Sequence, residues 1–495
     1  MLFNSAAFLI FFPIVLLVYY ILPQKIRYLW LLASSYYFYM CWNAKYALLL
    51  LTSTVITYVS GLLLEKAKSM PYDDGKKTRV KKAVVAASFV LNLGILMYFK
   101  YINFAFFTLA RVFSLIHIQL SAPVVDVILP VGISFYTFQA LSYTMDVYRD
   151  EIYAEKNFFR YALFVSFFPQ LVAGPIERSK NLLKQLSEPK KFDYDRAREG
   201  LLLMLWGFFL KIVVADRIAI FVDSVYGSYA SSGGLSLTVA TVLFAVQIYC
   251  DFAGYSTIAM GSAMFLGIHL MENFDAPYLS TSVHLFWRRW HISLTSWFKD
   301  YLYIPLGGSR KGKLRKYLNK MIVFLVSGLW HGAGFSFVIW GGLNGLYQII
   351  GEIMQPVKDK TVSLLRLHRN TFAHKAIQVL FTFFLVDFSW IFFRAPSCRV
   401  AFAIIRRMAD IRSFFESSLF SYGLGEKNFI VVGICLMILL IADICKRKGI
   451  CLRDKIMEQD YWFRWLLIAG AVTAVLTFGL WGPNYDAANF IYFQF

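Results

Sequence analysis

Charged residues are scarce in this chain. They make up 16% of its 495 residues, whereas a soluble domain has about a quarter. Hydrophobic residues account for 58% and the mean hydropathy is +0.56, so the composition excludes an ordinary soluble enzyme and indicates an integral membrane protein. Cysteine is also rare. The six cysteines form no C-x-x-C pair and show no metal-ligand spacing with histidine, so we expect neither a structural metal nor an essential disulfide.

The N-terminus lacks the features of a removable signal. Residues 1–23 have no basic leading region and no convincing small-residue cleavage site, which predicts a retained membrane span. The chain also lacks internal repeats, low-complexity linkers and any soluble module large enough to fold alone. The sequence therefore predicts one multi-pass membrane domain over residues 1–495.

Acidic residues are outnumbered, with 30 against 50 basic ones and a formal net charge of +20. The basic residues cluster in short connections between apolar runs, which argues against nucleic-acid binding. These clusters lie at residues 66–82, 299–320, 399–412 and 446–455. Because positive loops mark the cytoplasmic side of a membrane protein, we expect these loops to be cytoplasmic. Lys25 and Arg27, just after the first apolar run, then place the N-terminus outside, and part of the basic excess is a candidate for attracting an anionic substrate.

Apolar segments recur along the whole chain. They cover roughly residues 6–22, 28–41, 46–64, 83–99, 127–143, 158–174, 200–222, 235–268, 321–350, 376–393, 428–444 and 463–481. Some are short enough to be re-entrant, and others are long enough to be broken or paired. We therefore expect an all-α integral membrane fold with about ten to twelve transmembrane or re-entrant helices.

His331 is the first functional candidate. It lies almost at the middle of residues 321–350, a run without a charged residue that is long enough to cross a bilayer as one helix. An ionisable group at that depth is costly, and such groups tend to mark sites of chemistry or transport. The alternative is a core histidine bonded across helices. Small residues at Gly328 with Gly332, and at Gly341 with Gly345, indicate that part of this run serves packing.

His291 is the second candidate. The segment from His284 onward, if it forms one helix, has two faces and is typical of an amphipathic helix at the membrane interface. Its apolar face carries Phe286, Trp287, Trp290, Leu294, Trp297 and Phe298. Its polar face carries Arg288, Arg289, Ser293, Thr295, Ser296 and Lys299. His291 falls at the border of the two faces, where it would either look into a cavity or bond to an interfacial neighbour.

Four further polar residues lie within apolar segments: Gln247, Asp251, Asp146 and Asp387. Each is a candidate to orient a histidine, and each is also a candidate to brace a helix.

The motifs around the two histidines resemble those of the membrane-bound O-acyltransferase superfamily. The resemblance rests on RRWHISLTSWFKDYLYIPLGG and LWHGA, and on LPVGISFYTFQALSYTMDVYR, FFPQLVAGPIER, QIYCDFAGYSTIAMGSAMFLGI, NFDAPYLSTSVHLFWRRWHISL and the terminal FIYFQF. It covers nearly the whole chain and is most similar to the bacterial branch with the alginate O-acetyltransferases and the teichoic acid D-alanyltransferases.

This resemblance implies an active site. His331 corresponds to the family's essential histidine, and His291 to its second active-site position, which is asparagine in many eukaryotic members. Family members carry these residues in a central tunnel through a disc of tilted helices. Acyl transfer to a hydroxyl needs a base, and an imidazole can serve at neutral pH. We expect His331 to be that base, and His291 to polarise the thioester carbonyl or stabilise the oxyanion.

A thioester donor is the only cofactor expected, acetyl-CoA or an acyl-carrier protein, and none is bound permanently. Basic residues near His291 are candidates to attract its phosphates at the cytoplasmic mouth of the tunnel. They are Arg288, Arg289, Lys299 and Lys311, together with Arg310, Lys313, Arg315 and Lys316.

The sequence thus predicts a multi-pass enzyme of the bacterial cell membrane that moves an acetyl group toward an extracellular or cell-wall polysaccharide. An extracytoplasmic SGNH-type acetyltransferase or a small membrane-anchored protein is the expected partner. D-alanyl transfer to teichoic acid is the nearest alternative. A transporter with proton-coupling histidines is a more distant one, and it lacks the inverted repeats that many transporters show.

Overall fold

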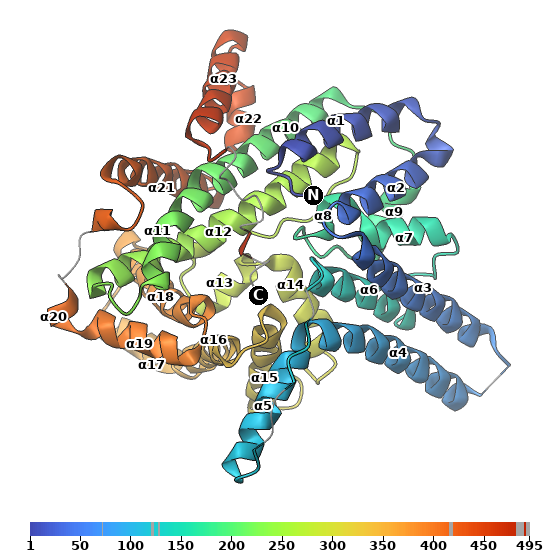
Figure 1. The fold of residues 1–495 in the computed structure, drawn as a ribbon, viewed down its shortest axis with the longest axis horizontal. Coiled ribbons are helices and arrows are strands. Elements are labelled where there is room, and N and C mark those ends of the chain that lie inside the picture. Colours follow the sequence, from blue (N-terminus) through green and yellow to red (C-terminus); the bar gives the residue numbers. More distant parts are fainter. Residues whose placement is uncertain (72, 120–122, 127–128, 415–418, 482–489, 492–495) are drawn as a thin grey trace. The chain divides into compact units, whose positions relative to one another are not determined.

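The computed structural model describes all of residues 1–495 except 72, 120–122, 127–128, 415–418, 482–489 and 492–495. Every regular element among the described residues is a helix, which confirms the all-α prediction (Figure 1). The chain divides into two compact units. The first unit comprises Met1–Met204 and Ile258–Met271, and the second comprises Leu205–Thr257 and Glu272–Phe495. The single domain over residues 1–495 stays a prediction.

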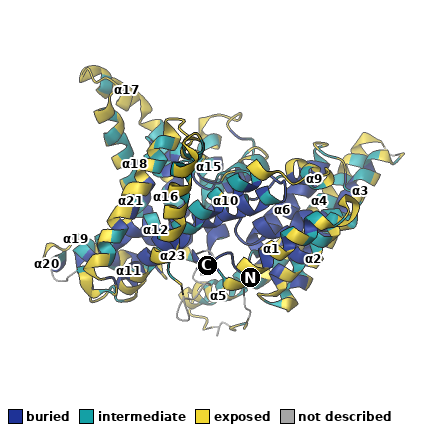
Figure 2. Cartoon of the chain, turned by 90° about the horizontal axis from the view of Figure 1, so that it is seen from above, coloured by how far each residue is buried: buried dark blue, intermediate teal, exposed yellow. Residues whose placement is uncertain are grey.

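The first unit is built around α6, which is buried along almost its whole length (Figure 2). Its helices are α1 (Ala6–Ile21), α2 (Arg27–Met40), α3 (Ala47–Ser69), α4 (Asp74–Leu96), α5 (Ile102–Leu115), α6 (Ile133–Tyr148), α7 (Phe158–Ser166), α8 (Phe168–Leu171), α9 (Ser179–Ser187) and the first part of α10 (Tyr194–Phe208). Buried hydroxyls and amides join these helices: Ser53 donates to Asn92 at 2.6 Å, and Tyr161 donates to Thr57 at 2.6 Å. Such interhelical hydrogen bonds stabilise helix packing where apolar surfaces also face lipid.

The second unit carries both candidate histidines. Its helices are η4 (Phe209–Ala215, a π-helix), α11 (Asp216–Gly227), α12 (Gly234–Phe265, up to Thr257), α13 (Val283–Arg289), α14 (Ile292–Phe298), η6 (Lys299–Tyr303, a π-helix), α15 (Lys313–His331), α16 (Phe335–Ile353), α17 (Gln355–Leu364), α18 (Phe372–Arg394), α19 (Cys398–Ala409), α20 (Ile411–Phe414), α21 (Glu426–Arg447), α22 (Leu452–Met457) and α23 (Tyr461–Phe478).

Six helical segments of the described chain are long and apolar enough to cross a membrane. They are Ala44–Ser69, Asp74–Leu115, Gly234–Phe265, Phe372–Arg394, Glu426–Arg447 and Tyr461–Phe478. The shorter α1 is also apolar. The multi-pass prediction is therefore confirmed, whereas the total of ten to twelve helices and the central tunnel stay predictions.

The apolar run of residues 321–350 is not one helix, which agrees with the expectation that the longest runs are broken or paired. α15 ends at His331 and α16 begins at Phe335, and the turn between them folds the two helices against each other. A Cβ atom on Gly328 would lie 2.2 Å from the carbonyl oxygen of Phe337, and one on Gly341 would lie 2.2 Å from that of Phe324. Close packing at these glycines is therefore confirmed. It occurs between α15 and α16, the two helices formed by this run.

The expected continuous interfacial helix after His284 was wrong. The segment forms two short helices, α13 and α14, with a break at Trp290 and His291. The break follows from the backbone of His291, which has φ 44° and ψ 56° and so cannot continue a right-handed helix. All six residues of the predicted apolar face are buried, as expected.

Candidate active site

The structure brings the two histidines together in the second unit. Their ring centroids lie 6.5 Å apart, although one residue begins α14 and the other ends α15. His291 is fully buried and His331 is 4% exposed. The helical projection placed His291 at the border of a polar face, whereas the structure buries it completely. Two imidazoles at this separation can contact the same small group placed between them.

His291 occupies a left-handed backbone conformation that is uncommon for a residue other than glycine. Asn273 holds the backbone after His291 in place. Its backbone oxygen accepts a hydrogen bond from the N–H of Ile292 at 3.0 Å, and its Oδ1 accepts one from the N–H of Ser293 at 3.2 Å. The Asn273 side chain in turn donates to Ser256 of α12 at 3.1 Å. Backbone strain of this kind clusters at functional sites, which supports His291 as a candidate.

Aromatic rings enclose His331. The centroids of Trp330, Trp340 and Phe393 lie 4.8, 5.0 and 5.3 Å from the imidazole centroid, at steep interplanar angles. Phe252 contacts His291 in the same way at 4.7 Å. Such rings exclude water and fix the orientation of the imidazoles.

A buried amide ties the helices around this aromatic shell. Asn344 of α16 accepts a hydrogen bond from the indole of Trp287 at 3.1 Å and donates to Ser389 of α18 at 3.2 Å. Because the shell is held from three helices, the imidazoles have little freedom to move. That rigidity is what a catalytic pair requires.

The two imidazoles differ in their electrostatic settings. Burial lowers the pKa of His291 to about 3, so this ring is neutral at physiological pH. A neutral imidazole donates one hydrogen bond and can polarise a carbonyl, as in other enzymes. His331 is the last residue of α15, at the end of the helix that carries the partial negative charge of the helix dipole. This contrast supports His331 as the base and His291 as the group that polarises the carbonyl.

Replacement of His291 by asparagine separates these roles. We expect His291→Ala to lower the acyl-transfer rate by about 10²-fold, the usual loss for one oxyanion donor, whereas His291→Asn keeps most of the rate because its amide also donates. Since the lowered pKa means that His291 gains a proton only as the pH falls toward 3, the pH profile of His291→Asn between pH 5 and 8 should match that of the parent. Steady-state rates across this pH range check both points, and a profile that shifts in His291→Asn would contradict a neutral His291.

Four of the eight basic residues proposed to attract donor phosphates fall into two groups. Arg288, Lys299 and Lys311 are exposed, so they remain candidates to attract an anion. Arg289 is engaged within the protein, because it donates to the carbonyl of Leu279 at 3.3 Å and to Ser280 at 3.2 Å. Its main contact is therefore structural.

Asp251 forms a buried ion pair. The Lys211 ammonium lies 2.7 Å from Asp251 and 2.7 Å from Asp216, and Asp251 also accepts a hydrogen bond from the backbone of Ile491 at 2.8 Å. This arrangement fits the bracing alternative for Asp251, since it joins α12 to the π-helix η4. Removing one partner of a buried pair costs about 3–5 kcal/mol, so loss of activity in an Asp251 variant would report on folding. Of the terminal FIYFQF, the residues after Ile491 lie outside the described part of the chain.

The other three polar candidates have separate surroundings. Asp146 lies in the first unit and accepts a hydrogen bond from Ser179 at 2.5 Å, which joins α6 to α9. Gln247 lies one turn before Asp251 on α12, and Asp387 lies one turn before Trp390 on α18. A part in orienting the histidines stays a prediction for these residues.

Sequence analysis missed Lys211 and Asn273. Lys211 had a signal, because it is a lone lysine within the apolar run of residues 200–222. Asn273 had none, since an asparagine in a polar loop is ordinary. Among the described residues, no group of three or more His, Cys, Asp or Glu side chains is placed to hold a metal ion.

The comparison with known proteins agrees with the geometry. A profile of the membrane-bound O-acyltransferase family, abbreviated MBOAT, matches residues 38–394, which include both histidines. A protein of Pseudomonas aeruginosa named probable alginate O-acetylase AlgI is 36% identical over 85% of this chain and 77% of its own length. A peptidoglycan O-acetyltransferase of Helicobacter pylori is 32% identical over 83% of this chain and 80% of its own length. A teichoic acid D-alanyltransferase of Bacillus subtilis is 30% identical over 46% of this chain and 59% of its own length.

Proposed function

Because the chain belongs to the membrane-bound O-acyltransferase family, we propose that it moves an acetyl group from a cytoplasmic thioester across a bacterial cell membrane for O-acetylation of a cell-surface polysaccharide. Family membership makes the chain an acyltransferase, and the transporter alternative is therefore set aside. The observation that carries the proposal is the buried pair of histidines 6.5 Å apart, since it offers a base and a carbonyl-polarising group to one reacting centre.

The acetyl group is favoured over D-alanine by the extent of the similarity. The O-acetyl relatives of Pseudomonas aeruginosa and Helicobacter pylori match 85% and 83% of this chain, whereas the Bacillus subtilis D-alanyltransferase matches 46%. D-alanyl transfer remains the second candidate.

In the proposed reaction the acceptor hydroxyl attacks the carbonyl carbon of the thioester while His331 takes the hydroxyl proton. His291 donates a hydrogen bond to the carbonyl oxygen as negative charge develops there. The tetrahedral intermediate then collapses, the carbon–sulfur bond breaks, and the proton held by His331 passes to the leaving thiolate. The exposed Arg288, Lys299 and Lys311 attract the donor's phosphates.

The burial of the site supports a partner that carries the acyl group onward. With His291 fully buried and His331 only 4% exposed, a thin pantetheine arm reaches the imidazoles more readily than a bulky polysaccharide strand does. We propose that an extracytoplasmic SGNH-type acetyltransferase, or a small membrane-anchored protein, presents the accepting hydroxyl and then acylates the polymer.

Donor choice tests this proposal. Membranes that contain the chain and its cell-surface acceptor should transfer radiolabel from acetyl-CoA into an alkali-labile ester, and membranes that contain His331→Ala should not. A D-alanyl-loaded carrier protein supplied in place of acetyl-CoA should give no label above the His331→Ala background. Labelling from the D-alanyl carrier alone would replace acetyl transfer with the second candidate.

A further inference from the structure

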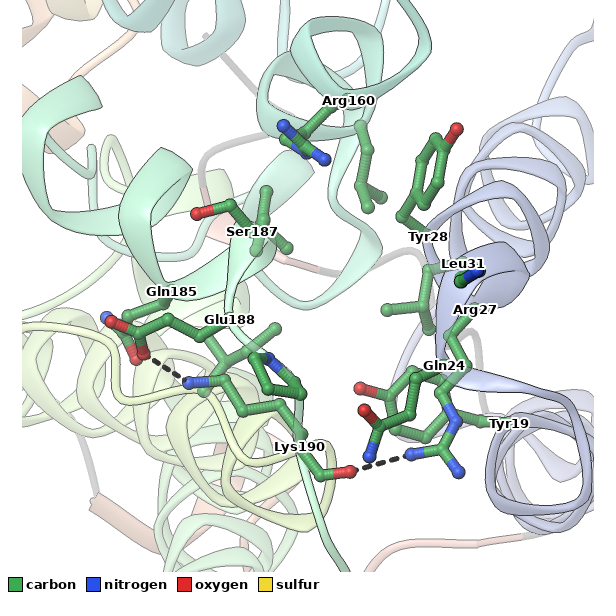
Figure 3. Close-up of a pocket in the computed structure, with 15 residues that line it drawn as sticks. Tyr19, Gln24, Arg27, Tyr28, Leu31, Arg160, Gln185, Ser187, Glu188 and Lys190 are labelled. Atoms are coloured by element: carbon green, nitrogen blue, oxygen red, sulfur yellow. Dashed lines mark hydrogen bonds and ion pairs between the residues drawn. The ribbon is translucent and has the colours of Figure 1, made fainter. Parts of the chain in front are cut away.

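A basic cavity lies in the first unit, separate from the histidine pair. It has a volume of about 220 Å³ and is bounded by the end of α1, the start of α2, α7, and the chain that follows α9. Its lining carries four basic side chains, Lys25, Arg27, Arg160 and Lys190, against the single carboxylate of Glu188 (Figure 3). The cavity therefore has a clear positive excess and favours an anion.

Two of these cations, Arg27 and Lys25, form no ion pair with a carboxylate of the described chain. Arg27 donates to the backbone oxygens of Leu22, Lys190 and Tyr20 at 2.9, 2.7 and 3.2 Å, so its charge meets neutral carbonyls. The side chain of Lys25 is exposed at the rim. The other two are partly paired, Lys190 with Glu188 at 2.9 Å and Arg160 with Glu155 at 3.6 Å.

Arg160 also carries a buried hydrogen-bond donor, its Nε atom, that has no acceptor among the described residues. Its guanidinium lies 5.7 Å from the ring centroid of Tyr28. A buried donor left without an acceptor is costly, and an anion in the cavity is the ligand that removes this cost. Guanidinium groups bind phosphate oxygens through paired N–H donors.

The helix α1, next to the cavity, exposes an apolar face. Ile10, Ile14, Leu17 and Ile21 follow one face of α1 at helical spacing and are 52–72% exposed. This apolar stripe runs to the C-terminal end of α1, and the cavity residues Gln24 to Tyr28 begin three residues later. The stripe lies on the face of α1 opposite Tyr19, which lines the cavity, so acyl chains attached to an anionic group there reach the stripe around the C-terminal end of α1, at Ile21.

We infer that this cavity binds the phosphate headgroup of an anionic phospholipid, whose acyl chains leave it around the C-terminal end of α1. The volume of about 220 Å³ suits a headgroup, because pockets for drug-sized ligands measure about 300–1,000 Å³. Basic pockets between helices at the cytoplasmic face bind such headgroups in other membrane proteins. The inference does not rest on the acyl-transfer reaction.

Thermal unfolding of the full chain in detergent tests the site, with phosphatidylglycerol, phosphatidylcholine or inorganic phosphate as the added probe. Phosphatidylglycerol should raise the unfolding temperature with a saturable midpoint, and the other two probes should not. The double variant Lys25→Gln, Arg160→Gln should move that midpoint up by roughly 30-fold, the loss expected for two cations near an anionic group. Glu188→Gln should move it down, because the repelling carboxylate is gone.

Lys45→Gln is the matched control, since Lys45 is an exposed lysine in the short 3-10 turn Ala44–Tyr46 after the C-terminal end of α2 and should leave the midpoint unchanged. Equal stabilisation by phosphatidylcholine, or an unchanged midpoint in both the double variant and Glu188→Gln, would overturn the headgroup site. Stabilisation by inorganic phosphate to the same extent would show a site for free phosphate and overturn the lipid. Because Glu188→Gln keeps every cation, it decides the question even where the double variant does not fold.

Discussion

His331→Ala is expected to lower polymer acylation by about 10² to 10⁴-fold, the usual worth of a positioned general base. The methyl group that remains cannot take a proton from the acceptor hydroxyl, and nearby water is excluded by Trp330, Trp340 and Phe393. The measurement is the ester content of the cell-surface polymer in cells that carry the variant as their only copy. Protein level and membrane insertion are measured in the same cells.

His368→Ala is the matched control for this experiment. His368 is an exposed histidine in the segment between α17 and α18, so its loss should change neither acylation nor protein level. A well-expressed His331→Ala protein with parental ester content would remove His331 from the mechanism. The cavity left by the imidazole also destabilises the site, and an unfolding temperature measured on the purified variant separates that effect from the chemistry.

The second large effect is the dependence on a partner. Purified chain with acetyl-CoA alone should hydrolyse the thioester slowly or leave it unreacted, because no hydroxyl is held about 3 Å from the carbonyl carbon. Addition of an extracytoplasmic partner that bears an acceptor serine should raise acetyl transfer by at least 10²-fold, and the same partner with that serine replaced by alanine should not. Rapid acetylation of free polysaccharide by the chain alone would show that the acceptor site is built into the membrane protein.

Both histidines could be found from the sequence, for physical reasons. A titratable residue within an uncharged apolar run is costly and therefore conspicuous, and the motifs around His291 and His331 resemble those of a known family. The glycines at 328 and 341 likewise indicated close packing, and the structure confirms it.

The local geometry of the site could not be predicted in the same way. A helical projection assumes an unbroken helix, but Asn273 and Ser256 hold His291 in a left-handed conformation through contacts that are remote in the sequence. Hydropathy alone also cannot locate the turn that ends α15 at His331, because the residues on both sides are equally apolar. The distance between the imidazoles depends on these two breaks, so only the structure gives it.

The partners of the buried charges were also beyond sequence analysis. Asp251 and Lys211 are 40 positions apart and meet because η4 packs against α12. A pattern search treats each as an isolated polar residue. From the sequence alone, Asp251 is therefore as good a candidate to orient a histidine as to brace a helix.

Sided proteoliposomes test the central claim most directly. The chain is reconstituted with its partner facing the lumen, labelled acetyl-CoA is added outside, and ester-linked label on the lumenal acceptor is measured. The account predicts label inside sealed vesicles that contain the parent chain, and none with His331→Ala, when donor and acceptor never share a compartment. Transfer that occurs only when acetyl-CoA and the acceptor are on the same side would contradict movement of the acyl group across the membrane.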